Sequence, residues 1–122
     1  MLCERFSERS GLQVTQRIAE SLPEISPEAE LVIYRVAQEA LTNIARHSGS
    51  DRAQVTLASG GGGVTLAVRD WGRGLARDIV PGSGIRGMRE RAALIGATVE
   101  IKNDGSGPGC ELRLKVTLEG SR

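Results

Sequence analysis

The chain has few aromatic residues, few cysteines and almost no net charge. Its 122 residues include one Trp, one Tyr, one Phe, one His and two Cys, and the formal net charge is +1. Cys3, Cys110 and the sole histidine, His47, do not have metal-site spacing, which argues against a zinc cluster. The balanced charge gives no basic surface of the kind that nucleic-acid binding needs, so we expect no nucleic-acid partner.

Long apolar runs are also missing. No stretch approaches the roughly 18 apolar residues that cross a bilayer, and residues 1–20 contain charges throughout, which argues against a secretory signal. We therefore expect a soluble, cytoplasmic domain that makes no membrane contact itself. A length of 122 residues with 39% hydrophobic residues fits one domain over 1–122, in which 1–10 would be the end of an upstream helix or linker.

Glycine is abundant, with 16 residues against a usual share of about 7%. Apolar periodicity and turn residues predict the order β-α-β-β-α-β-β. Ser26 is the expected N-cap of the first helix, with Pro27 at its first position. The fold class expected is a two-layer α/β (α+β) sandwich, with helices on one face of a mixed, mostly antiparallel sheet. The elements are predicted as a strand at 11–19, a helix from 27 to 47 or 48, strands at 52–58 and 64–70 joined by the tetraglycine 60–63, a helix from about 88 that stops at Gly96, a strand around 99–101 and a strand at 112–118.

A polar row lies along the first predicted helix. Glu39, Asn43 and His47 are spaced i, i+4, i+8, so they share one side of the helix at the border of its apolar arc. Buried polar groups need partners, so three in a row suggest a ligand or metal site. In the alternative, Asn43 bonds a neighbouring backbone group and His47 is an ordinary residue at the helix end.

Two further patterns involve an acid and glycines. Asp70 shares the strand parity of Val64, Leu66 and Val68, so the strand should end with a carboxylate on its core face, where it could accept from the exocyclic amine of adenine. The alternative is an Asp that caps the next turn. The segment 82–87 matches G-x-G-x-x-G before a helix, but no strand precedes it as a dinucleotide fingerprint requires. Helix N-terminal N–H groups there could bind phosphate, and a loop without a ligand is the alternative.

Taken together, the three patterns resemble the Bergerat-fold ATPases, and most closely the catalytic domain of sensor histidine kinases of the nitrate-sensor-like subfamily. Residues 38–48 resemble the N box, 70–75 the G1 box and 82–92 the G2 box. Two residues depart from the family pattern. Trp71 stands where the family commonly has Asn or Asp, and Cys110 stands where it usually has Thr. The resemblance implies ATP and Mg²⁺ as cofactors, with Asn43 and Glu39 as catalytic and metal-binding residues, and the nucleotide bound by Arg46, His47, Asp70, Gly72, Gly74, Gly82, Gly84 and Gly87.

The resemblance also implies partners that this chain does not contain. An upstream dimerisation domain would supply the acceptor histidine, and a response regulator would receive the phosphoryl group. We therefore expect histidine kinase activity in a larger protein, while this chain alone binds Mg·ATP without autophosphorylation. Trp71, next to Asp70, is expected to report nucleotide binding by fluorescence. The alternatives are an anti-sigma-factor-type serine kinase and a non-catalytic module that docks onto a partner.

Overall fold

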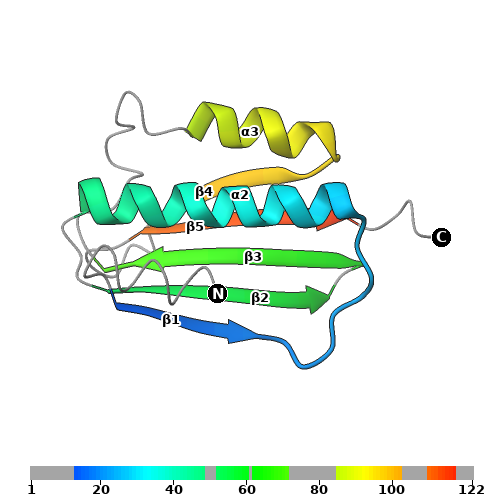
Figure 1. Cartoon of the computed structure of the whole chain (residues 1–122), viewed down its shortest axis with the longest axis horizontal. Coiled ribbons are helices and arrows are strands. Elements are labelled where there is room, and N and C mark those ends of the chain that lie inside the picture. Colours follow the sequence, from blue (N-terminus) through cyan, green and yellow to red (C-terminus); the bar gives the residue numbers. More distant parts are fainter. Residues whose placement is uncertain (1–12, 49–51, 61, 72–84, 103–109, 118–122) are drawn as a thin grey trace.

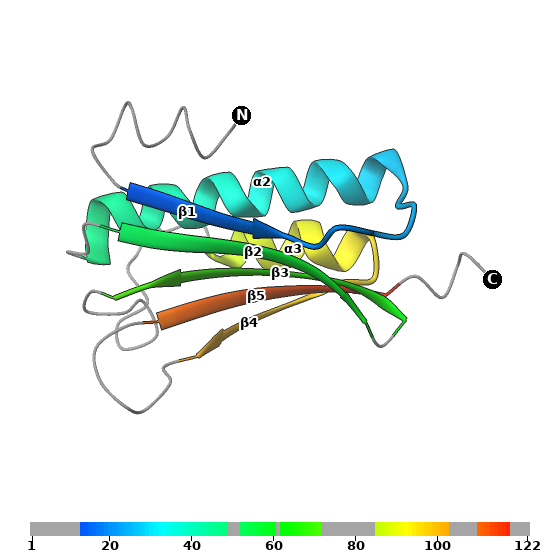
Figure 2. The same cartoon turned by 90° about the horizontal axis from the view of Figure 1, so that it is seen from below.

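The structure is a computed structural model that describes residues 13–48, 52–60, 62–71, 85–102 and 110–117. Within these ranges the chain forms one layer of strands and one layer of helices (Figures 1 and 2). The elements are β1 (Gln13–Ile18), α2 (Pro27–Asn43), a π-helical turn η1 (Ile44–Ser48), β2 (Arg52–Gly60), β3 (Gly63–Asp70), α3 (Ile85–Leu94), β4 (Thr98–Lys102) and β5 (Cys110–Thr117).

The described strands form one mixed sheet in the order β1-β2-β3-β5-β4. β1 pairs with β2 in parallel, and the other three pairs are antiparallel. Both helices cover the same face of this sheet (Figure 2), which confirms the predicted two-layer arrangement. The parallel pair requires a crossover connection, and α2 provides it.

The core lies between α2, α3 and the covered face of the sheet. Its members follow helical spacing on α2 and alternate along β3 and β5, as the sequence predicts. Leu41, Met88 and Leu114 are fully buried at its centre. The N-terminus of α2 is also as predicted, because the Ser26 hydroxyl accepts from the Ala29 N–H at 3.0 Å and Pro27 opens the helix.

The end of α2 differs from the prediction of a regular helix to residue 47 or 48. The α-helix ends at Asn43 and continues as the π-helical turn Ile44–Ser48. A π-turn uses i→i+5 bonds, so His47 does not follow Asn43 by the offset that an α-helix would give. The structure places the backbone of His47 in this turn and does not describe its side chain, so the predicted row is described only at Glu39 and Asn43. No Gly or Pro within 44–48 announces the change.

Two glycine segments also differ in detail from the sequence prediction. Gly60 and Gly63 are paired residues of β2 and β3, so the hairpin turn is shorter than the four glycines. Helix α3 begins at Ile85, which places Gly87 inside its first turn rather than before the helix. Gly96 ends α3 as predicted, with φ +70°.

The backbone at Gly96 has a Schellman arrangement. The Ala97 N–H donates to the Ala92 carbonyl at 2.8 Å, and the Gly96 N–H donates to the Ala93 carbonyl at 3.1 Å. This cap turns the chain directly into β4. Neither α2 nor α3, the helices in the described ranges, has the length and apolar character needed to cross a membrane.

Candidate functional site

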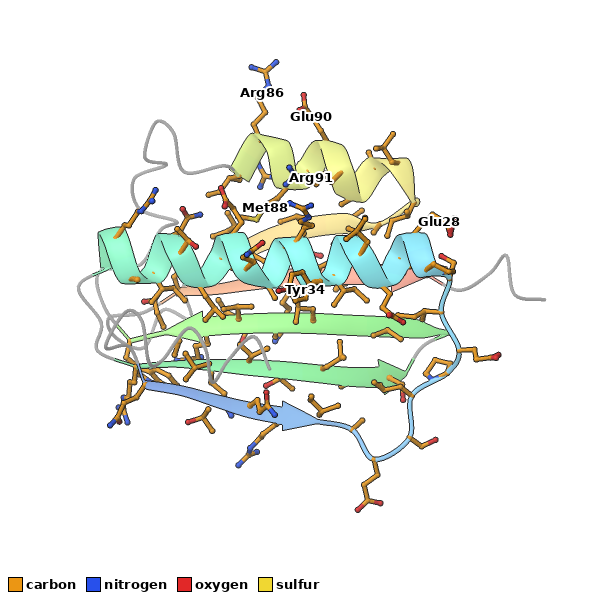
Figure 3. The ribbon with its side chains drawn as sticks, in the orientation of Figure 1. Glu28, Tyr34, Arg86, Met88, Glu90 and Arg91 are labelled. Atoms are coloured by element: carbon orange, nitrogen blue, oxygen red, sulfur yellow. The ribbon has the colours of Figure 1, made fainter. Side chains whose placement is uncertain are left out.

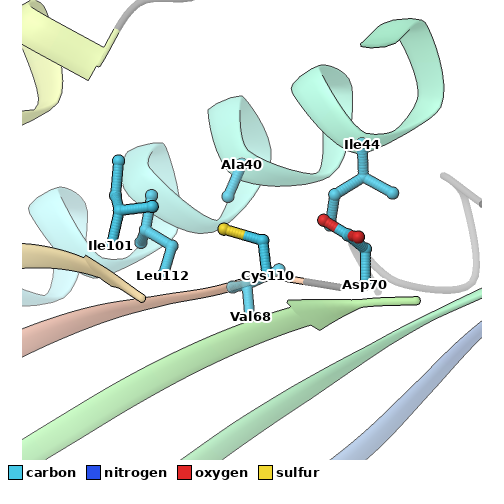
Figure 4. Close-up of a pocket in the computed structure, with 7 residues that line it drawn as sticks. All are labelled: Ala40, Ile44, Val68, Asp70, Ile101, Cys110 and Leu112. Carbon is cyan, nitrogen blue, oxygen red and sulfur yellow. The ribbon is translucent and has the colours of Figure 1, made fainter. Parts of the chain in front are cut away.

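A small pocket opens between the end of α2 and the end of the central strand β3, where Asp70 lies. Apart from Asp70 and Cys110, its described walls are aliphatic (Figure 4). Asp70 is 2% exposed, so this carboxylate is held in an apolar environment. The residues that line the pocket are Ala40, Ile44, Val68, Asp70, Ile101, Cys110 and Leu112.

Strand register explains why an acid and a thiol meet there. Asp70 is the last residue of β3 and Cys110 the first of β5, and the two are paired across the ladder. Every second residue of β3 from Val64 to Asp70 is buried, as is every second residue of β5 from Cys110 to Val116. Both side chains therefore leave the sheet on the face that α2 covers. The structure confirms the predicted core-facing position of Asp70.

The polar residues of α2 have different environments. Asn43 is buried, with 3% of its surface exposed, while Glu39 is half-buried and Arg46 is exposed. The Asn43 side-chain nitrogen Nδ2 is buried and has no hydrogen-bond partner among the described residues. For His47 the structure gives the backbone position in η1.

A buried amide without a partner costs stability, which makes Asn43 a candidate for binding a ligand. The amide carries a carbonyl oxygen as well as the nitrogen, and this oxygen can serve as a ligand or a hydrogen-bond acceptor. Oxygen ligands suit Mg²⁺, which is commonly held by one or two protein groups together with substrate phosphates and waters. The described residues contain no cluster of three or more His, Cys, Asp or Glu side chains suited to a metal, and a magnesium site completed by nucleotide phosphates does not need one.

Trp71 faces away from the pocket, although it follows Asp70 directly. Its ring centroid lies 4.6 Å from the Arg52 guanidinium carbon and 5.5 Å from that of Arg69. Arg69 is on the uncovered face of β3, opposite to Asp70. The side chain of Trp71 is thus stacked with arginines on the reverse side of the sheet and is not among the residues that line the described pocket. That its fluorescence reports nucleotide binding stays a prediction.

The glycine-rich segment is only partly within the described residues. Gly72, Gly74, Gly82 and Gly84 lie outside them, and the structure therefore does not test their predicted roles. Gly87 is half-buried in α3, and a Cβ built there would meet no atom of the described residues beyond its own helix backbone within 4 Å.

Helix α3 presents different side chains to its two sides (Figure 3). Met88 is fully buried between α3 and α2, whereas Arg86 and Glu90 point away from α2. The Arg86 Nε and Glu90 Oε2 atoms are 3.8 Å apart, and both side chains are largely exposed, so this pair contributes little to stability.

The sequence prediction missed the aliphatic walls of the pocket. Val68 and Leu112 were predicted as strand residues but not as pocket residues. Strand alternation could have identified them as pocket residues, because each lies two positions from Asp70 or Cys110 on the same strand face. Ile101 could not be assigned in this way, since its place beside the pocket depends on the order in which β4 and β5 pair.

Comparison with known proteins identifies the family. Residues 28–120 match the family described as histidine kinase-, DNA gyrase B- and HSP90-like ATPases. The chain belongs to this ATPase family. Sensor histidine kinase MctS of Rhizobium johnstonii is 33% identical over 111 residues, which cover 87% of this chain and 24% of MctS. Sensor histidine kinase YhcY of Bacillus subtilis is 34% identical over 103 residues, covering 82% of this chain and 27% of YhcY.

Solved structures of histidine kinases contain a region with the fold of this chain. The histidine kinase AdeS of Acinetobacter baumannii aligns with a TM-score of 0.76 and 16% identity, over 95% of this chain and 59% of that one. The blue-light activated histidine kinase EL346 of Erythrobacter litoralis aligns with a TM-score of 0.77 and 20% identity, over 99% and 41% of the two chains. The ATPase family and the sensor kinase relatives together assign the chain as a catalytic ATP-binding domain of the sensor histidine kinase type. It spans about a quarter of the length of MctS and YhcY.

Proposed function

We propose that this domain binds Mg·ATP with the adenine in the Asp70 pocket and delivers the γ-phosphoryl group to a histidine on a separate domain. The observation that carries the proposal is the burial of the Asp70 carboxylate in an aliphatic pocket at the end of β3. A buried carboxylate accepts strong hydrogen bonds, and the exocyclic amine of adenine is a donor of suitable size. The aliphatic walls suit the faces of a base.

The other end of the nucleotide would lie toward the end of α2. Asn43 would hold Mg²⁺ through its side-chain oxygen, with Glu39 half-exposed beside it to bind the metal or orient a water. Arg46 and His47, in the turn that follows, would approach the phosphates, and Gly72, Gly74, Gly82, Gly84 and Gly87 would shape the nucleotide pocket and its lid. Bound Mg²⁺ would supply charge that stabilises the transferring phosphoryl group. The protein's own task in phosphoryl transfer is mainly to position these groups.

The proposed acceptor lies in another part of a larger kinase. Relatives named as sensor histidine kinases are about four times as long as the matched region, which leaves room for a dimerisation domain with its own histidine. The phosphoryl group would pass from that histidine to an aspartate of a response regulator. The named relatives give no support to the serine kinase alternative.

Calorimetric titration of the chain with Mg·ADP tests the adenine site. We expect saturable binding, and Asp70→Asn should weaken it by about tenfold to a hundredfold, because a hydrogen bond to a charged group is worth about 1.5–3 kcal/mol. Calorimetry is preferred to fluorescence because the Trp71 ring lies against Arg52 and Arg69.

Glu111→Gln is the matched control, since it removes a carboxylate charge from β5 next to Cys110 but on the uncovered face of the sheet. This variant should bind Mg·ADP as the parent chain does. Equal affinity of the parent chain and Asp70→Asn would remove Asp70 from the site. A parent chain that binds no nucleotide at millimolar concentration would overturn the proposed function.

A further inference from the structure

The thiol of Cys110 belongs to the same pocket wall as the carboxylate of Asp70. The two residues are directly paired between β5 and β3, and Cys110 is 5% exposed. Directly opposite residues of an antiparallel pair have Cβ atoms roughly 4.5–5.5 Å apart. Figure 4 shows both side chains rising from neighbouring strands toward α2. A group that bonds to Asp70 from within the pocket therefore lies beside Cys110 as well.

Close packing around Asp70 makes single atoms of the pocket wall decide what fits beside its carboxylate. Cys110 and Val68, which line the pocket with Asp70, are 5% and 2% exposed. Val68 precedes Asp70 by two positions on β3 and Leu112 follows Cys110 by two positions on β5, and both line the pocket with aliphatic groups. Sulfur is bulky and only a weak hydrogen-bond donor or acceptor, so the effect of Cys110 on a ligand is mainly steric.

We propose that Cys110 determines which purines the site admits. Its sulfur fills the space beside the 6-position of a base whose exocyclic amine bonds to Asp70, and it thereby excludes substituents on that amine. The ligand class is purine nucleotides with an unsubstituted 6-amino group. This inference rests on the proposed function, because a base held by Asp70 is its premise.

The test compares two nucleotides on the chain and on a variant with a smaller wall residue. Dissociation constants for ADP and N6-methyl-ADP are measured by calorimetry in the presence of Mg²⁺. N6-methyl-ADP keeps one N–H for Asp70, so the methyl group is the main difference between the ligands. We expect the parent chain to prefer ADP by at least tenfold, and Cys110→Ala to reduce that preference at least threefold by making room for the methyl group.

Two further variants control for general effects on the core. Val116→Ala removes buried atoms from the same face of β5, about 20 Å along the strand from Cys110, and should leave the preference for ADP unchanged. Cys110→Ser retains a polar group of smaller size and should also reduce the preference. It provides the measurement if Cys110→Ala does not fold.

The possible results distinguish a failure of this inference from a failure of the proposed adenine site. If the parent chain binds ADP but does not discriminate against N6-methyl-ADP, Cys110 has no steric role and the inference is wrong. The same conclusion follows if both Cys110 variants keep the parent preference, and in either case the proposed function stands. If the parent chain binds neither nucleotide, the proposed function fails and this inference fails with it.

Discussion

Two polar side chains, Asn43 and Asp70, are buried among the apolar residues of the described core. Each lies at the end of its element, and the ends of α2 and β3 are on the same side of the molecule (Figure 1). Burying a polar group costs stability unless a partner compensates for it. Their positions at one end of the two layers place both residues on the side of the molecule where the nucleotide is proposed to bind.

Replacement of Asn43 should separate stability from nucleotide binding. We expect Asn43→Ala to leave the free energy of unfolding within about 1 kcal/mol of the parent value, because the desolvation cost of the unpartnered amide, about 1–3 kcal/mol, offsets the packing that is lost. The same variant should lose most of the Mg²⁺ dependence of ADP binding. Urea unfolding and calorimetry with and without Mg²⁺ measure the two effects.

Leu41→Ala is the matched control on the same helix, because Leu41 is fully buried and apolar. Its truncation should cost about 2–5 kcal/mol of unfolding free energy. It should retain Mg²⁺-dependent binding at temperatures where it stays folded. A loss of stability in Asn43→Ala as large as that in Leu41→Ala would show that Asn43 serves the core rather than a ligand.

The helices and strands were largely predictable because local signals determine them. Ser26 with Pro27 fixes the start of α2, alternation fixes β3 and β5, and Gly96 fixes the end of α3. The π-turn after Asn43 was not predictable, since it depends on how the helix end packs and not on a marker residue. The outward position of Trp71 follows from strand parity and could have been found by extending the alternation beyond Asp70.

Paired glycine substitutions in and after α3 should change stability in opposite directions. Gly87→Ala should raise the free energy of unfolding by about 0.5–1 kcal/mol, because Gly87 is inside the helix and a Cβ there has open space among the residues that the structure describes. Gly96→Ala should lower it by about 1–2 kcal/mol, because φ at Gly96 is +70°. Thermal or urea unfolding of both variants measures these shifts.

Nucleotide affinity gives Gly87→Ala a second readout. If Gly87 helps to shape the nucleotide site, the more stable variant should bind Mg·ADP more weakly, whereas Gly96→Ala should keep its affinity while folded. If Gly87→Ala raises the free energy of unfolding and leaves the affinity for Mg·ADP unchanged, Gly87 affects the stability of α3 and not the nucleotide site.

The domain contains the proposed nucleotide site, and its single histidine is His47. That residue follows Asn43 in the turn η1, within the segment proposed to contact the phosphates. We therefore expect the chain to bind Mg·ATP and to form no stable phosphohistidine. Incubation with γ-labelled ATP, followed by a search for acid-labile, base-stable label on the protein, provides the measurement. Stoichiometric label on His47 would contradict the proposed division between the nucleotide site and a separate acceptor.

The parallel pairing of β1 with β2 has a consequence for folding kinetics. Gln13 pairs with Arg52, which is 39 positions later, whereas Gly60 pairs with Gly63 across a short turn. Contacts between residues far apart in sequence form slowly because closing a long loop costs entropy. The β2–β3 hairpin can therefore form early, and β1 can join only after α2 has crossed the sheet. β1 is also an edge strand with mostly exposed side chains, so its amide protons should exchange with solvent before those of β3 and β5.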